Sequence, residues 1–148
     1  MPHAGLMDES ALGPELGPLQ REKLHMRGAR RRLRQGKISA GIVTLYDALS
    51  AAMAWYIASP ERKKRLKVLQ GEDLTDDKAV FSILRRTGVL SSSFDYELFD
   101  RLVDVAASQE LPGFDYDEVL RGIESVITQL GVMPFDEAEL PPEDPSTY

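Results

Sequence analysis

The sequence predicts an all-α protein, an antiparallel bundle of five to six helices. Apolar residues recur at steps of three and four, Gly and Pro separate these stretches, and no segment alternates convincingly as a strand would. The chain has 148 residues, 43% of them hydrophobic, which is enough for one core. We expect the bundle over residues 18–131, a flexible lead-in over 1–17 and an acidic, Pro-containing tail over 132–148.

The first predicted helix runs from Pro18 to about Gln35. The second and clearest helix, Ile38–Ala58, is apolar on one face, and small residues on another face allow a neighbouring helix to approach closely. Ser59-Pro60 ends it, and Pro60 can open a short basic helix that continues to Leu69. The apolar stripe of the first helix consists of Leu19, Met26, Ala29 and Leu33.

Three further helices are predicted in the second half of the chain. The first begins after a cap at Thr75 or Asp76 and stops at Gly88. The others cover residues 96–109 and 116–130, and Gly131 is the expected stop of the last.

The last two predicted helices begin with a repeated Phe-Asp-Tyr, at residues 94–96 and 114–116. The favoured reading is a helix start used twice, with Asp95 and Asp115 as N-caps and Glu118 completing a capping box with Asp115. Phe94 is then placed to pack on Phe99. The alternative is a binding repeat.

Charge is strongly segregated along the chain. The net charge is −6, but residues 1–70 carry +7 and residues 71–148 carry −13. We expect the basic helices to lie against the acidic ones, with a nucleic-acid surface as the alternative. The candidate binding residues on the basic helix are Arg27, Arg30, Arg31, Arg34 and Lys37.

Asp47 is the one charged residue of the second helix, so it is a candidate buried polar group. Buried carboxylates are usually paired, and we expect a packing salt bridge to Arg30, Arg31 or Arg34. The less favoured alternatives for Asp47 are a ligand-binding or catalytic role and a partly exposed position.

Most familiar catalytic centres are excluded by composition. The chain has no cysteine, and its two histidines, His3 and His25, lie near the N-terminus. Thiolate chemistry is therefore impossible, and no P-loop, GxGxxG, HExxH or EF-hand pattern occurs. We expect no metal, no cofactor and no enzymatic activity.

No signal peptide is visible, and we expect a cytoplasmic protein without a membrane partner. Ile38–Ala58 is long enough for a membrane span, but Asp47 and its many Ala and Ser residues favour a buried bundle helix.

The run Gly36–Ile57, which contains Leu45-Tyr46-Asp47-Ala48-Leu49, resembles the first long helix of HEPN-type domains. Residues 84–102, LRRTGVLSSSFDYELFDRL, are similar to the mid-domain turn and third helix of that family. The resemblance, over residues 30–130, implies an antiparallel bundle that often dimerises and serves RNA- or nucleotide-linked systems. Ribonuclease members carry an Arg-x4–6-His motif near their last helices. The nearest match here, Arg21-x-x-x-His25, is one residue too short and at the wrong end, so ribonuclease activity is not implied.

The sequence thus predicts a non-catalytic helical binding or adaptor module that self-associates or binds a protein partner. The partner surface would use the basic helix Arg21–Lys37 or exposed aromatic residues such as Trp55 and Tyr56. The alternative is an RNA- or DNA-associated protein that uses the same arginines.

Overall fold

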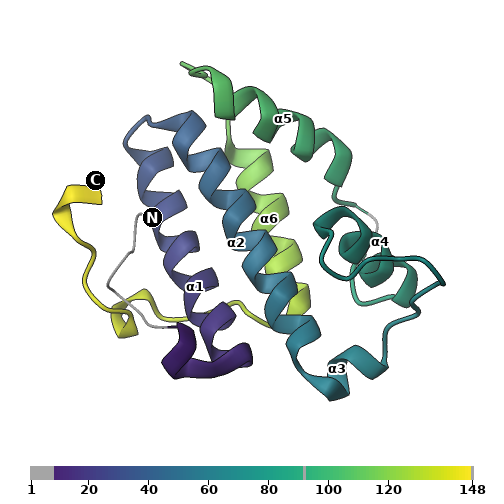
Figure 1. Cartoon of the computed structure of the whole chain (residues 1–148). Coiled ribbons are helices and arrows are strands. Elements are labelled where there is room, and N and C mark those ends of the chain that lie inside the picture. Colours follow the sequence, from purple (N-terminus) through teal and green to yellow (C-terminus); the bar gives the residue numbers. More distant parts are fainter. Residues whose placement is uncertain (1–8, 92, 148) are drawn as a thin grey trace.

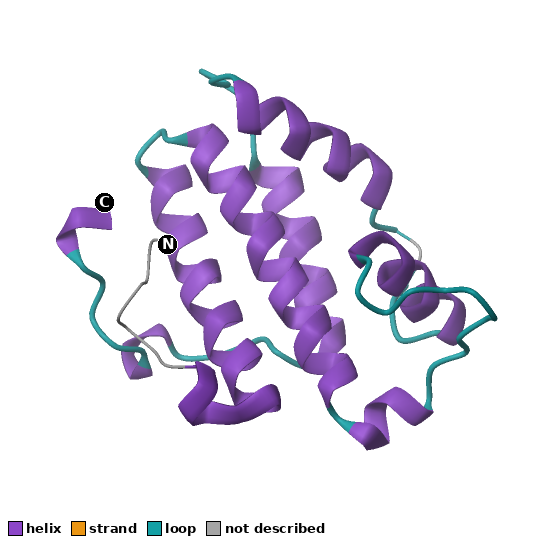
Figure 2. Ribbon diagram, in the orientation of Figure 1, coloured by secondary structure: helices purple, strands orange, loops and turns teal. Residues whose placement is uncertain are grey.

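The computed structural model describes residues 9–91 and 93–147 (Figure 1), and in them all regular structure is helical (Figure 2). The all-α prediction is confirmed. The helices are α1 (Glu9–Arg34), α2 (Ile38–Ala58), α3 (Pro60–Lys64), α4 (Asp77–Thr87), α5 (Tyr96–Ser108) and α6 (Asp117–Leu130), followed by short 3-10 helices η1 (Glu137–Glu139) and η2 (Pro145–Thr147).

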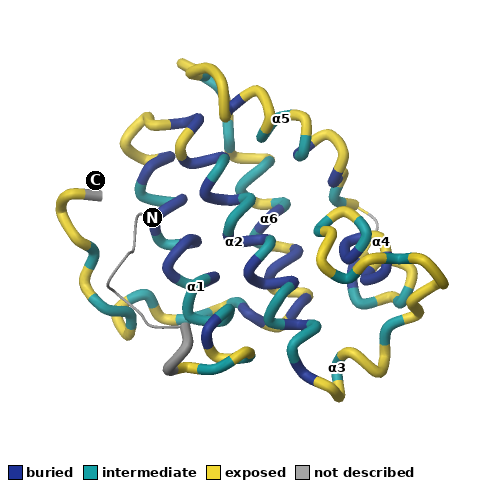
Figure 3. The backbone as a smooth tube through the Cα atoms, in the orientation of Figure 1, coloured by how far each residue is buried: buried dark blue, intermediate teal, exposed yellow. Residues whose placement is uncertain are grey.

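Helix α2 is the centre of the bundle, because α1, α4, α5 and α6 all pack on it (Figure 1). Its bounds are those predicted, and buried positions run along its whole length (Figure 3). Ile42, Leu45 and Leu49 are fully buried on its apolar face. Within the described part of the chain, α2 is also the one helix long and apolar enough to cross a membrane, but most of it is covered by its neighbours.

Helices α1 and α2 approach closely where their contact residues are small. A Cβ at Gly41 of α2 would lie 2.6 Å from Leu33 Cδ2 of α1. On the α1 side, a Cβ at Gly28 would lie 4.0 Å from Thr44 Cγ2. Arg32 Nη1 donates a hydrogen bond of 3.0 Å to Thr44 Oγ1 across this interface. The predicted stripe of small residues on α2 therefore serves helix–helix packing.

Helix α1 begins at Glu9 instead of near Pro18, so residues 9–17 are helical where we predicted a flexible lead-in. Residues 1–8, with His3, lie outside the described residues. Gly13 (φ 89°) interrupts the helix, and Pro14 opens the continuous part, where a missing N–H costs no hydrogen bond. Pro18 lies one turn later and removes only the bond to the Pro14 carbonyl.

Side-chain caps set several of the remaining helix ends. Asp76 accepts a hydrogen bond from the N–H of Lys78, and Gly88 ends α4 in the left-handed conformation (φ 90°), both as predicted. Ser59 caps α3, which is shorter than predicted and ends at Lys64. Beyond Lys64, Lys67 N–H is held by Thr87 Oγ1 of α4, so residues 65–74 form an ordered loop instead of further helix.

Two aromatic residues proposed as an exposed partner surface are covered. Tyr56 is buried in the core, and Trp55 is partly covered by the guanidinium of Arg62, 3.8 Å from its ring centroid. Arg62 also donates to the carbonyls of Trp55 and Tyr56 and thereby caps the end of α2. The expectation of an exposed aromatic surface is wrong for Tyr56, which is buried, and the ring of Trp55 is partly buried beneath the guanidinium of Arg62.

The described part of the acidic tail, residues 132–147, turns back from α6 and runs beside α1 (Figure 1). Val132 is buried, and the ring of Phe135 lies under Lys23 and Arg30 of α1. Glu137 and Glu143 form ion pairs with α1 arginines. Of the two states considered for this segment, disordered or docked, the structure shows a docked one.

Candidate functional site

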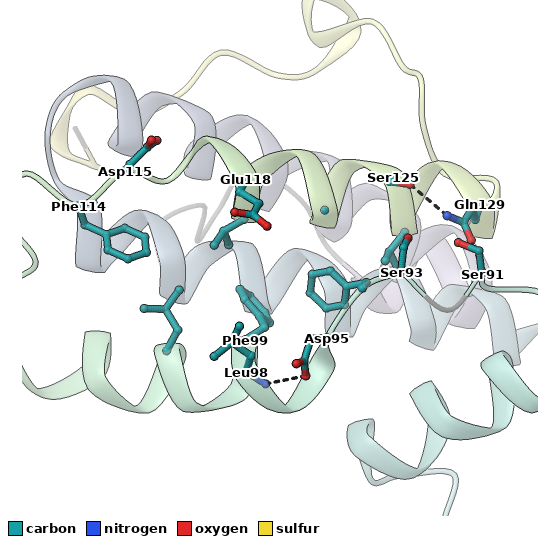
Figure 4. Close-up of a pocket in the computed structure, with 15 residues that line it drawn as sticks. Ser91, Ser93, Asp95, Leu98, Phe99, Phe114, Asp115, Glu118, Ser125 and Gln129 are labelled. Carbon is teal, nitrogen blue, oxygen red and sulfur yellow. Dashed lines mark hydrogen bonds between the residues drawn. The ribbon is translucent and has the colours of Figure 1, made fainter.

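A groove lies between α5 and α6, which both pack on α2 while their own backbones stay apart. Its volume is about 500 Å³ (Figure 4). Its apolar lining consists of Phe94, Leu98, Phe99, Leu102, Phe114, Val119 and Val126. Apolar surface gathered in a concave site on a small protein is typical of a binding site. We refer to it as the α5–α6 groove.

The beginning of α5 is fixed by Asp95, as predicted. Its side chain accepts a hydrogen bond of 3.0 Å from the N–H of Leu98. Phe94, the residue before it, packs on Phe99 with ring centroids 5.6 Å apart and on Phe81 of α4 at 5.8 Å. These contacts place one wall of the groove on a cluster of buried aromatic rings.

Gly122 of α6 allows the ring of Phe94 to pack closely against this helix. A Cβ at position 122 would lie 2.9 Å from Phe94 Cδ1, so the ring occupies the space that any other residue would need. The glycine therefore fixes how deep the groove is at this point.

The second Phe-Asp-Tyr begins its helix differently from the first. Helix α6 starts at Asp117, and its N-cap residue, Tyr116, makes no capping side-chain bond. Asp115 instead accepts a hydrogen bond of 3.1 Å from the N–H of Asp117, and this bond closes a turn that precedes the helix. The predicted capping box of Asp115 and Glu118 is therefore wrong, because the helix begins one residue later than the box requires.

Both Phe-Asp pairs nevertheless line the α5–α6 groove. Helices α5 and α6 run antiparallel, so the two pairs stand toward opposite ends, with Asp115 at one end and Asp95 toward the other (Figure 4). The reading that we did not favour, a repeat that serves binding, agrees with this placement. Each pair adds one aromatic ring and one carboxylate to the groove.

The charge of the groove is uniformly negative. Asp95, Asp115 and Glu118 line it, and no Lys or Arg does. The remaining polar lining consists of Ser91, Ser93, Ser125 and Gln129. A ligand that brings positive charge beside an apolar surface would be complementary to this site.

Three of the five predicted binding residues on α1 are already paired within the chain. Arg30 contacts Glu124 of α6 at 2.6 Å and Glu137 of the tail at 2.7 Å. Arg27 and Arg31 both contact Glu143, Arg27 with a distance of 3.1 Å from Nε to Oε1. Arg34 and Lys37 are exposed at the end of the same helix and the following turn.

Asp47 is half-buried, and its countercharges differ from those predicted. Burial raises the pKa of its carboxyl, and Arg21 and Arg32 act in the opposite direction. Both arginines lie on α1, as expected, but they are not Arg30, Arg31 or Arg34. Arg30 and Arg31 instead lie on the side of α1 that faces the tail.

Glu22 is a buried carboxyl that we did not single out. The residue is 0% exposed, and among residues 9–91 and 93–147 neither of its carboxyl oxygens has a hydrogen-bond partner. Burial raises the pKa of Glu22 to about 8, although Lys23 and Arg30 pull it down. The burial of Glu22 could have been predicted from the sequence, because position 22 lies on the same helix face as the apolar stripe formed by Leu19, Met26, Ala29 and Leu33.

No family model matches this chain, and the searches of curated proteins and of solved structures gave no match either. The resemblance to HEPN-type domains therefore stays a prediction. The function has to be argued from the geometry of the chain itself.

Proposed function

We propose that this protein is a non-catalytic binding module whose α5–α6 groove receives one amphipathic helix from a partner protein. The observation that carries the proposal is the apolar groove between two helices whose backbones stay apart, with carboxylates and no base along it. Grooves of this kind bind the apolar face of a helix, whose side chains recur at steps of three and four.

The partner helix would carry Lys or Arg beside its apolar face. Asp95, Asp115 and Glu118 stand along the groove and would meet these cations. Their placement at the rim favours orientation and selectivity over affinity, because exposed charge pairs contribute little free energy.

The size of the groove limits the length of the partner segment. The lining residues on α6 run from Glu118 to Gln129, which is about 17 Å of helix axis at 1.5 Å per residue. A helix of about 12 residues would fill it.

Leu98 is the most accessible apolar side chain of the groove, with 56% of the residue exposed. It is the residue that we expect a partner to cover first. Because the free protein does not bury it, its replacement should affect binding without affecting the fold.

The test uses fluorescence anisotropy with labelled peptides of about 12 residues. Both peptides carry the same Leu stripe, flanked by Lys in one and by Glu in the other. We expect the Lys peptide to bind at least tenfold more tightly, and Leu98→Gln to weaken it about tenfold. Leu69→Gln is the matched control, since Leu69 is 58% exposed and lies outside the groove.

Equal binding of the two peptides would contradict the charge argument, and an equal effect of the two Leu substitutions would contradict the site. Sedimentation velocity of the full chain tests a competing occupant. If the protein dimerises and Leu98→Gln abolishes the dimer, the groove binds a second copy instead of a partner helix.

A further inference from the structure

The five cations predicted as a binding surface share one side of α1 and the turn after it. We refer to Arg27, Arg30, Arg31, Arg34 and Lys37 as the basic face. From Arg27 to Arg34 successive members are one or three residues apart and cover about 10 Å of the axis of α1 at 1.5 Å per residue, and Lys37 follows in the turn after the helix.

The acidic tail covers only the first part of the basic face. Glu143 pairs with Arg27 and Arg31, and Glu137 pairs with Arg30. Arg34 and Lys37 continue the face, and in the described structure no ion pair reaches them. The covered part therefore adjoins an uncovered part of the same charge.

The way the tail is attached indicates that it can be displaced. Residues 132–147 contain five acidic residues and no basic one, and their regular structure is two 3-10 helices of three residues each. Glu137 contacts Arg30 from the first of these 3-10 helices, and Glu143 contacts Arg27 and Arg31 from the irregular segment between the two. The pair between Arg30 and Glu137 is the more exposed and is screened by salt, whereas Glu143 is only 15% exposed and anchors the tail, so a competing phosphate has to replace Glu143 beside Arg27 and Arg31.

We propose that the basic face binds the phosphate backbone of a nucleic acid, and that the acidic tail occupies part of this face and competes with it. A polynucleotide presents one anion at every nucleotide and can therefore serve all five cations in sequence. The carboxylates of the tail pair with three of these five cations, Arg27, Arg30 and Arg31.

A nucleic acid fits this face better than an acidic peptide does. The guanidinium groups offer forked hydrogen-bond donors that match the geometry of a phosphate group. The exposed end of the face, Arg34 to Lys37, has no apolar side chain against which an apolar side chain of a peptide could pack. Backbone contacts of this kind hold a nucleic acid without reading its sequence. The site is separate from the α5–α6 groove, so the two proposals stand or fall independently.

The test measures binding of a fluorescein-labelled single-stranded RNA of mixed sequence to the full-length chain. The double variant Glu137→Gln/Glu143→Gln removes the two tail carboxylates that pair with the face, while Arg30 keeps its contact with Glu124 of α6. We expect it to bind at least tenfold more tightly than the unaltered protein at 50 mM salt. The control is Glu139→Gln/Glu110→Gln, which changes the net charge equally at two exposed residues that form none of these ion pairs.

The salt dependence checks the number of phosphates engaged. For five cations on a single strand, the slope of log K against log salt should be about −3.5, and Arg34→Gln in the double variant should reduce it by about 0.7. Circular dichroism of each variant confirms that the helices are retained.

Three outcomes would overturn the inference. Equal RNA binding by the double variant and its charge-matched control would show that the tail does not compete. The absence of RNA binding by the double variant at 50 mM salt would show that the face does not take phosphate. Displacement of the RNA by polyglutamate at an equal concentration of charges would assign the face to acidic peptides instead.

Discussion

The interface between α1 and α2 and the groove between α5 and α6 are both built around glycine, yet one is closed and the other open. At Gly41 the side chain of Leu33 enters the space of the missing Cβ, and the two helices meet. At Gly122 the ring of Phe94 does so, but α5 and α6 stay apart. The difference is where the residue opposite the glycine lies: Leu33 belongs to the helix that packs on α2, whereas Phe94 belongs to the segment before α5, so its contact with Gly122 leaves the two helices themselves apart.

The two regions also depart from the usual distribution of polarity in opposite directions. The closed side of the molecule contains Glu22, a fully buried carboxyl without a hydrogen-bond partner in the described part of the chain. The open side exposes Leu98 and leaves Phe94 and Phe114 partly exposed along the groove. Both features oppose folding, because a carboxyl is costly to bury and apolar surface is costly to leave in water.

The largest expected effect is that of Glu22→Met, which places a flexible apolar side chain in the closed region. The folded chain keeps the proton of Glu22 up to a pKa of about 8, whereas the unfolded chain releases it near 4.5. The free energy of unfolding therefore falls as pH rises from 4.5 to 8 and levels off above that. At pH 9 the variant should be more stable by up to about 5 kcal/mol.

Urea denaturation at pH 5, 7 and 9 measures this difference between the two proteins. Exposed Glu110→Met is the control and should leave the decline between pH 5 and 8 unchanged. A decline of the same size in the Glu22→Met protein would show that Glu22 is not its source.

The second prediction compares the same substitution at the two contact glycines. Gly41→Ala should lower the free energy of unfolding by about 1–2 kcal/mol, because Leu33 is buried and cannot move aside. Gly122→Ala should cost about 0.5 kcal/mol or less, since Phe94 is partly exposed and can turn into the groove. Losses of equal size would mean that the groove is as rigid as the interface.

The third prediction concerns the charged contact between α1 and the tail. Glu143→Gln removes a carboxylate shared by Arg27 and Arg31, whose side chains are only 11% and 12% exposed, and should cost about 1–2 kcal/mol at low salt and slightly less at 0.5 M salt. Glu139→Gln, a neighbour in the tail without such a contact, is the control. Thermal unfolding at both salt concentrations separates the two, and a loss that salt does not reduce would contradict an electrostatic contact.

Local signals in the sequence predicted the helices well. The α2 range was correct at both ends, and Asp76, Gly88, Asp95 and Gly131 act where their residue types predicted. These signals work because a cap or a left-handed glycine depends only on its neighbours in the chain. Asp115 was misassigned because an Asp can accept from the N–H two or three residues on, and the sequence does not distinguish these geometries.

The α5–α6 groove could not be predicted in the same way. Periodicity identifies the face that a helix buries, but the gap between α5 and α6 depends on how each of them packs on α2. The repeated Phe-Asp-Tyr was the available clue, since both copies line the groove. Charge segregation predicted that basic and acidic segments would meet, but not which of the arginines on α1 would face the tail.

The smallest expected effect on stability is that of Leu98→Gln, the variant that should most affect binding. Leu98 is 56% exposed, so the substitution should change the free energy of unfolding by no more than about 0.5 kcal/mol. Phe99→Ala, at the next position but buried beneath the groove, should cost about 3 kcal/mol or more. Urea denaturation of the two variants thus separates the surface of the groove from its support. A loss above 1 kcal/mol for Leu98→Gln would mean that the fold itself uses this side chain, and the argument that the groove awaits a partner would then lose its basis.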